Sequence, residues 1–151
     1  MKKTSITDIT KLRQVTKAGI MDCRKALEES GGDLEEAKKW LLKKGLSKAA
    51  KKAERATKAG LIEAYIHAGG TVGAMVKLTC ETDFVARTPE FKKLAHEIAM
   101  QAAATSPKDV EALLKQEYIR DPSKKVSDLI KAAIAKLGEN IKVEDFKRLK
   151  V

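Results

Sequence analysis

The chain has 151 residues and a formal net charge of +10, from 31 Lys and Arg residues against 21 Asp and Glu residues. This length holds one modest domain or two small ones and argues against a large catalytic core. Aromatic residues make up only 4% of the chain, while Ala, Leu, Lys and Glu dominate, which favours helices over a wide sheet.

Two features predict a soluble, cytoplasmic protein. No run approaches the ~18–20 consecutive apolar residues of a membrane span, and the first three residues are followed by polar ones instead of the apolar core of a signal peptide. Cys23 and Cys80 stand far apart without CxxC spacing. We therefore expect reduced, buried thiols.

Residues 1–46 are predicted to form a domain of three short helices. One face of the first helix carries Ile9, Leu12 and Val15. A second helix covers about residues 22–30 and ends at Gly31, because glycine readily adopts the backbone conformation that stops a helix.

The third helix of this domain has a recognisable start. Asp33 and Glu36 have the spacing of a capping box, and we expect the helix to end before Gly45. Its apolar stripe consists of Leu34, Ala37, Trp40 and Leu41. Trp40 is a possible partner-binding residue, but a bundle this small needs it for the core.

Residues 47–60 are predicted to form a basic helical connector that ends at Gly60. Residues 1–60 carry 16 basic and 8 acidic side chains, whereas residues 61–151 carry 15 and 13. Seven basic residues and one acidic residue fall within 43–58. Such a run is usually a solvated helix face, with RNA or an acidic protein surface as the alternative partner.

The third unit, residues 61–151, begins with an alternating pattern that predicts a β-hairpin with a turn at residues 68–71. We expect the helix-covered face of the hairpin to carry Ile62, Ala64, Ile66, Val72, Val76 and Leu78. The opposite face then carries Leu61, Tyr65 and Met75, which is more apolar than a fully solvated sheet needs.

Helices and one further strand complete this unit. Thr88 and Pro89 form an N-cap and first turn for a helix with an apolar stripe, a shorter helix follows, and another ends at Gly138. The tail, residues 141–149, is compatible with a third strand that pairs back onto the hairpin. The expected fold class is α+β: an N-terminal three-helix domain, a helical connector, and a small antiparallel three-stranded sheet packed with helices.

The segment CETDFVAR, residues 80–87, joins the second strand of the hairpin to the next helix. Asp83 and Phe84 therefore lie on a short connection between rigid elements, where binding groups usually sit. Two roles remain open at this point. Phe84 is either presented to a partner or packed into the core, while Thr82 or Asp83 satisfies local backbone donors.

Three motifs together resemble bacterial elongation factor Ts, the guanine-nucleotide exchange factor of elongation factor Tu. They are CETDFVAR, an N-terminal TKAGIMDCRKALEESGGDLEEAKKWLLKKG and a later AIAKLGENI. The resemblance runs from about Ile9 to Leu149. It implies that the N-terminal three helices form a ubiquitin-associated-like domain, which adds a second docking surface on the GTPase.

The resemblance also implies how exchange works. Phe84 would insert between helices of the GTPase domain of elongation factor Tu, near the magnesium side of its nucleotide site, while Asp83 makes polar contacts. Thr82 and Val85 would shape and anchor the loop. The chain itself would bind no cofactor and no metal. Short members of the family associate by two-fold symmetry, so we also expect a homodimer built around the sheet.

Enzymatic chemistry is not expected. The sequence has no P-loop, dinucleotide fingerprint, nucleophile elbow or metal-spaced histidines, and its two histidines, His67 and His96, fit ordinary surface roles. Glu81 and Asp83 lack an identified base or nucleophile. The alternative function is a basic RNA-binding or ribosome-associated protein. Nucleic acid contact is not expected, however, because interleaved aromatic residues and known base-reading modules are missing.

Overall fold

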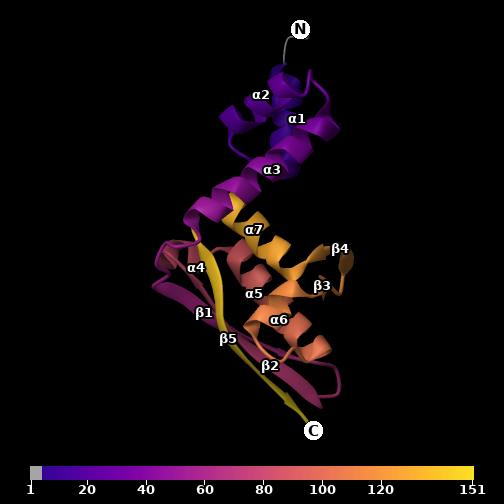
Figure 1. The fold of residues 1–151 in the computed structure, drawn as a ribbon, viewed down its shortest axis with the longest axis vertical. Helices are drawn as coiled ribbons and strands as arrows, with labels where there is room; N and C mark the ends of the chain where they lie inside the picture. The colour runs from indigo at the N-terminus through magenta and orange to yellow at the C-terminus, as the bar shows by residue number, and fades with distance from the viewer. Residues whose placement is uncertain (1–4) are drawn as a thin grey trace.

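The structure, a computed structural model, describes residues 5–151 apart from the side chains of residues 46 and 48. A helical bundle forms one end, and helices packed on a three-stranded sheet form the other (Figure 1). The elements are α1 (Ile6–Thr16), α2 (Ile20–Glu29), α3 (Leu34–Lys52), β1 (Ala59–Ile66), β2 (Val72–Cys80), α4 (Asp83–Ala86), α5 (Pro89–Thr105), α6 (Val110–Lys115), β3 (Glu117–Tyr118), β4 (Asp121–Lys125), α7 (Val126–Leu137) and β5 (Ile141–Lys150). This confirms the α+β class.

The bundle of α1, α2 and the first half of α3 has a small core of its own. Its buried residues are Leu12, Cys23, Ala26, Leu27 and Ala37. Asp33 caps α3 by accepting hydrogen bonds from two amides of the first turn, and Trp40 packs against this core as predicted. Val15 is 66% exposed, so its predicted place on the core face was wrong. At 3.6 residues per turn, Val15 lies about 120° around the helix from Ile9.

Helix α3 is one continuous helix of 19 residues that serves both ends of the molecule. Its first half forms part of the bundle. In its second half, Ala49 belongs to the core between the sheet and the helices, and the last turns pack on α7. The predicted end before Gly45 was wrong because Gly45 lies against α7, where a Cβ atom would come 2.8 Å from the Cβ of Ala135. After Lys52 the chain leaves the helix and reaches β1 without regular structure.

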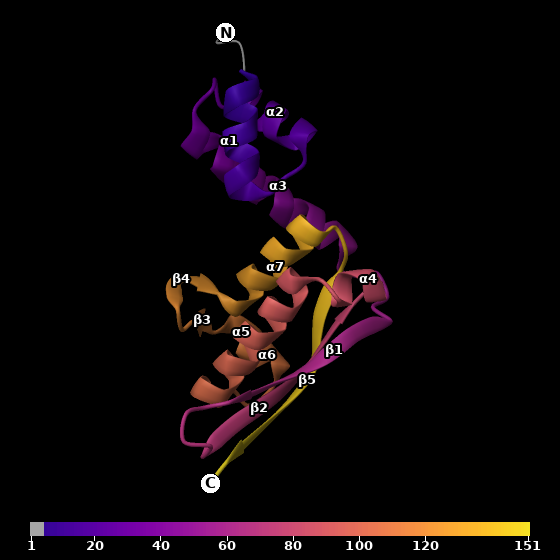
Figure 2. The ribbon, with the colours of Figure 1, turned by 180° about the vertical axis from the view of Figure 1, so that it is seen from behind.

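The sheet has the strand order β1-β2-β5 and is antiparallel throughout. The tail pairs with β2 along its whole length, which confirms the predicted third strand. Helices α5 and α7 cover one face of the sheet, as the front and back views show (Figures 1 and 2). The other face of the described sheet is open. Among the described residues, no helix is both long and apolar enough to cross a membrane.

The predicted face of β1 was wrong. Ile62 and Ile66 are 69% and 66% exposed on the open face, whereas Leu61 and Tyr65 pack under the helices. The turn explains the inversion. Ile66 pairs with Gly73 on either side of the connection 67–72, so odd-numbered residues of β1 pair with even-numbered residues of β2. Paired residues lie on the same side of the sheet, which puts Leu61 and Tyr65 on the side of the buried residues of β2. The alternating pattern alone does not reveal this register.

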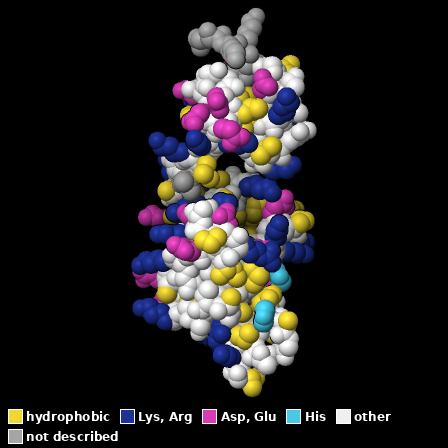
Figure 3. Space-filling view, turned by 90° about the vertical axis from the view of Figure 1, so that its right-hand side faces the viewer, with side chains coloured by type: hydrophobic (Ala, Val, Ile, Leu, Met, Phe, Trp, Pro, Cys, Tyr) yellow, Lys and Arg dark blue, Asp and Glu magenta, His cyan; other side chains and the backbone are white. Residues whose placement is uncertain are grey.

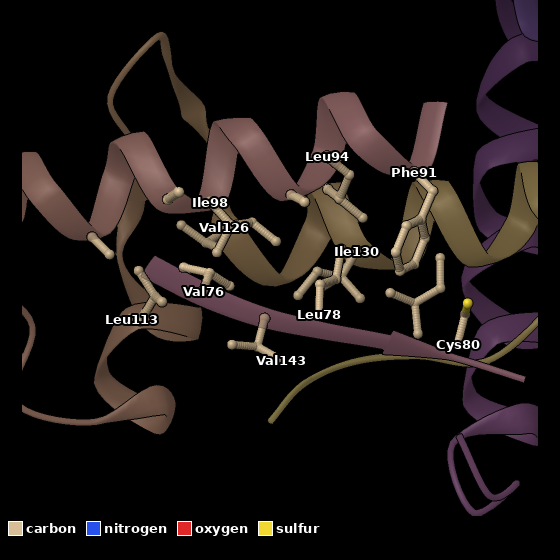
Figure 4. Close-up of a cluster of buried hydrophobic side chains, with 14 of the residues drawn as sticks. Val76, Leu78, Cys80, Phe91, Leu94, Ile98, Leu113, Val126, Ile130 and Val143 are labelled. Carbon is tan, nitrogen blue, oxygen red and sulfur yellow. The ribbon is translucent and has the colours of Figure 1, made fainter. Parts of the chain in front are cut away.

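The main core lies between the sheet and the helices (Figure 4). The predicted stripe of α5 is buried throughout: Phe91, Leu94, Ala95, Ile98 and Ala102. Side chains of β2 meet this stripe from below, with Val76, Leu78 and Cys80 fully buried. Val126 and Ile130 of α7, which lies beside α5 on the same face of the sheet, complete this core (Figure 4).

A two-stranded hairpin, β3–β4, was not predicted. It is held on α5 by the buried side chain of Gln101, whose Nε2 donates to the Glu117 carbonyl at 3.0 Å. Glu97 accepts a hydrogen bond from the Tyr118 hydroxyl and pairs with Arg120 at 3.2 Å. Burial, together with this hydrogen bond to Glu97, raises the pKa of Tyr118 to about 12. The short strands carry no strong sequence pattern, so local periodicity did not predict this hairpin.

Candidate partner-binding site

The segment that carries the predicted site residues is a single helical turn, α4, between β2 and α5. Thr82 occupies the N-cap position and Arg87 the C-cap position. Thr88 begins α5 as predicted: its hydroxyl accepts from the Phe91 amide at 3.2 Å and donates to the Val85 carbonyl at 2.8 Å. Thr82 makes no side-chain capping hydrogen bond itself, so the support for this turn comes from the capped start of α5 that directly follows it.

Phe84 and Val85 are neighbours on this turn but differ sharply in exposure. Phe84 is 82% exposed, whereas Val85 is 9% exposed and belongs to the main core. Successive residues of a helix point about 100° apart, so anchoring Val85 turns Phe84 outward. Packing of Phe84 into the core, one of the two roles that the sequence left open, is therefore wrong. The side chain is presented at the surface.

The carboxylate of Glu139, which directly follows the C-cap of α7, holds the start of the turn. Its two oxygens accept from the Thr82 amide at 2.9 Å and from the Thr82 hydroxyl at 2.6 Å. The thiol of Cys80 donates to the Thr82 carbonyl at 3.1 Å. Burial, with a contribution from the charge of Glu139, raises the pKa of Cys80 and keeps this thiol protonated for that bond.

Glu81 forms a second connection to the same region. Its Oε1 accepts from the Asn140 amide at 2.7 Å and lies 3.5 Å from Arg55. The hydrogen bond from Asn140, followed by the charge of Arg55, lowers the pKa of Glu81. The buried side chain of Asn140 donates to the carbonyls of Ala53 and Arg55, at 3.1 and 2.7 Å. Three distant segments therefore meet behind α4.

Sequence reasoning missed the roles of Arg55, Glu81, Glu139 and Asn140 in this site. Residues 82 and 139 are 57 positions apart, so no local pattern joins them. A signal was nevertheless present, because Glu139 and Asn140 directly follow a helix stop at Gly138 in the motif AIAKLGENI.

Asp83 stays on the surface beside Phe84. It pairs with Arg87 at 2.7 Å across one helical turn, and both side chains are more than half exposed. Such a pair adds little to stability, so both charges can change partners at low cost. The four predicted site residues thus divide into two anchored ones, Thr82 and Val85, and two displayed ones, Asp83 and Phe84.

The histidines lie in a different cluster, with His67 directly after β1 and His96 on α5. His96 contacts Glu63 at 3.1 Å, and His67 contacts the Tyr65 hydroxyl at 3.1 Å. Figure 3 shows both histidines on the lower half of the molecule, beside a patch of hydrophobic side chains. Within residues 5–151, no group of three or more His, Cys, Asp or Glu side chains is arranged to hold a metal ion.

Comparison with known proteins gives consistent matches. The family model described as Elongation factor TS matches residues 81–151, which include the whole α4 turn. Elongation factor Ts of Thermotoga neapolitana is 43% identical over 192 aligned residues, covering 99% of this chain and 98% of the relative. This alignment is longer than the 151 residues of the chain, so the relative contains segments that this chain lacks.

Two further relatives extend the match to other bacteria. Elongation factor Ts of Thermoanaerobacter sp. is 42% identical over 185 residues, covering 93% of this chain and 91% of the relative. Elongation factor Ts of Nostoc sp. is 48% identical over 146 residues, covering 97% of this chain but only 46% of the relative. On this level of identity along nearly its whole length, the chain belongs to the elongation factor Ts family.

Proposed function

We propose that the chain is a translation elongation factor that promotes GDP release from elongation factor Tu by inserting Asp83 and Phe84 near the magnesium and phosphate site of that GTPase. One observation carries the proposal. Phe84 is 82% exposed on a turn whose neighbouring residues are buried or hydrogen-bonded. A large apolar side chain on a turn that is already held in place can enter a partner without first being ordered, which is what a wedge requires.

The energetics support a wedge. Burying a Phe side chain in a partner contributes about 1.5–3 kcal/mol. The turn is already ordered by Glu139 and Glu81, so little entropy is lost when it binds. On the partner side, Mg²⁺ requires near-octahedral oxygen ligands at ~2.0–2.1 Å, so a small displacement of the nucleotide site weakens its hold on GDP.

The binding of nucleotide and the binding of this chain to the GTPase affect each other reciprocally. A protein that weakens nucleotide binding is itself weakened by nucleotide to the same factor, so GTP rebinding releases the chain. The chain accelerates exchange and performs no hydrolysis, which makes it a binding protein and not an enzyme. Exchange on elongation factor Tu would place it in the bacterial cytoplasm.

The bundle is proposed to add a second docking surface on the same GTPase domain. Ile20 and Met21 at the start of α2 are 54% and 70% exposed, which is unusual for two adjacent apolar residues in a small bundle. The proposed units are residues 1–46, the connector 47–60 and residues 61–151, with α3 shared between the first two. With two contacts on one GTPase, the binding energy of the bundle contact offsets the free-energy cost of inserting Phe84.

The active unit is proposed to be a homodimer formed through the open face of the sheet. That face carries Ile62, Ala64, Ile66, Met75 and Leu149. Met75 was expected on this face, whereas Ile62, Ala64 and Ile66 of β1 replace the expected Leu61 and Tyr65, and the open face is still apolar. A second copy packed on it would remove this surface from water.

RNA binding gains no support from the basic segment. Lys52 donates to the carbonyl of Gly138, and Arg55 pairs with Glu81, so two of its cations hold the region behind α4. Their side chains are engaged in the fold instead of forming a separate phosphate-binding surface.

Release of a fluorescent GDP analogue from elongation factor Tu, timed after mixing with the chain, tests the proposal. Phe84→Ala should abolish most of the stimulated release. Ile119→Ala, which shortens another exposed apolar side chain on the far hairpin, is the matched control and should leave release unchanged. Full stimulation by the Phe84→Ala chain would overturn the proposed role of α4.

A further inference from the structure

A cleft of about 560 Å³ lies at the waist of the molecule, between the bundle and α7. It is formed by the turn between α1 and α2, by the middle of α3 and by one face of α7. Figure 3 shows the hollow between the upper and lower halves, with Lys and Arg side chains beside it. Its size is within the range of small-molecule sites, ~300–1,000 Å³.

The lining of this waist cleft is strongly basic. Against the single acidic residue Asp22, it contains Lys17, Lys38, Lys44, Lys124, Lys131 and Lys136. The first three lysines belong to the bundle side and the last three to the side of α7 and β4. Like charges therefore face one another across the cleft, and a multivalent anion between them would relieve this repulsion.

The present partners of these lysines are weak competitors for such an anion. Four of the lysines form surface ion pairs with acids outside the lining: Lys38 with Glu35, Lys124 with Asp121, Lys131 with Asp128, and Lys136 with Glu90. Exposed pairs of this kind contribute little to stability, so their lysines can turn toward a ligand. Lys44 is held more firmly, by Asp22 at 2.8 Å and by the ring of Trp40.

We propose that the waist cleft binds a polyphosphate anion through lysines from both halves of the molecule. Lysine ammonium groups bind phosphate as point charges, and several phosphates in a chain match lysines spread around one cleft. The anion is either inorganic or part of a nucleoside polyphosphate. The apolar wall offers a place for a nucleobase: Val15, Leu41, Leu42, Ala132 and Ala135.

A bound anion would also join the two halves. The bundle and the sheet unit are connected by α3 and touch where Gly45 meets Ala135. An anion that pairs with Lys17 on one side and Lys131 on the other adds a second connection across the waist.

Isothermal titration of the full chain with inorganic triphosphate, GTP and adenosine tests the proposal. The cleft variant is Lys17→Gln/Lys131→Gln/Lys136→Gln. The control variant is Lys11→Gln/Lys25→Gln/Lys92→Gln, which removes the same charge from exposed positions outside the cleft. Thermal unfolding of both variants confirms that they are folded.

The cleft variant should bind triphosphate at least about tenfold more weakly than the parent, since each hydrogen bond to a charged group contributes about one tenfold step in affinity. The control variant should bind like the parent. Tighter binding of GTP than of triphosphate would identify a nucleoside polyphosphate, and equal binding an inorganic one. Equal weakening in both variants, or no binding of triphosphate and GTP at millimolar concentration, would overturn the proposal.

Discussion

At the scale of single residues, the site depends on a contrast between neighbours. Val85 is buried in the main core and Phe84 is exposed on the same helical turn. The buried residue fixes the direction of the exposed one, and Glu139 fixes the backbone before both. The exposed side chain of Phe84 can thus be shortened with little effect on the fold, whereas shortening Val85 removes packing from the core.

Stability measurements on two alanine variants test this contrast. Phe84→Ala should change the free energy of unfolding by no more than about 0.5 kcal/mol, as for other exposed positions. Val85→Ala should lower it by about 1–2 kcal/mol, because buried methyl groups are lost. Urea unfolding gives both values. A loss with Phe84→Ala as large as that with Val85→Ala would place Phe84 in the core and refute the wedge.

The lowered pKa of Glu81 predicts that the stability of the fold depends on pH. Its pKa is lowered from the usual 4.5 by the Asn140 amide and then by Arg55, so the unfolded chain takes up this proton first as the pH falls. The stabilisation from Glu81 is complete above about pH 4.5 and is lost as the pH falls through the lower folded-state pKa.

Melting temperatures measured between about pH 6 and pH 3 test whether this stabilisation is lost as the pH falls. The parent should lose more stability than Glu81→Gln over this interval, so that the two curves converge at acidic pH. Glu111→Gln is a control, because Glu111 lies at 2.5 Å from Lys115 in an exposed pair far from α4. Parallel curves for the parent and Glu81→Gln would contradict the assigned role.

At the scale of elements, α3 shows how packing overrides a local stop signal. Glycine inside a helix costs about 1 kcal/mol relative to alanine. At Gly45 the absence of a side chain lets α3 approach α7 closely, and the contact offsets that cost. The helix therefore continues, and the bundle is carried on a rigid extension of the helical layer.

A swap of two residues tests this contact. Gly45→Ala should destabilise the chain by about 1–3 kcal/mol, because the new Cβ would lie 2.8 Å from the Cβ of Ala135, which has no rotamer to move aside. Adding Ala135→Gly should restore most of the loss. Urea unfolding of the single and double variants measures the coupling. A single Gly45→Ala chain more stable than the parent would show that the close approach is unimportant.

At the scale of the whole molecule, one face of the sheet is covered and the other is apolar and open. Light scattering across a dilution series should give the mass of two 16.6 kDa chains for the parent. Ile62→Lys/Ile66→Lys should give one chain, because two charges would be buried in the interface. Ile119→Lys is the control on another surface. A parent of monomer mass at micromolar concentration, with exchange intact, would refute the dimer.

The sequence by itself determined the elements whose signals are local. The Asp33 and Thr88 caps and the buried stripe of α5 are as predicted, because caps and helical periodicity depend on residues within about one turn of each other. The third strand also follows from a short segment with clear boundaries. The sequence placed Asp83 and Phe84 on a short connection, but only the burial of Val85 showed that Phe84 is exposed and not in the core.

Only the tertiary structure decided the features that depend on distant partners. The turn of the hairpin set which face of β1 is covered, α7 allowed α3 to continue through Gly45, and Glu139 reached Thr82 across 57 positions. An alternating strand fits either face equally well until another element packs on it. Local patterns therefore predict which elements form, while the free energy of packing between elements selects their faces, their lengths and the contacts that support the site.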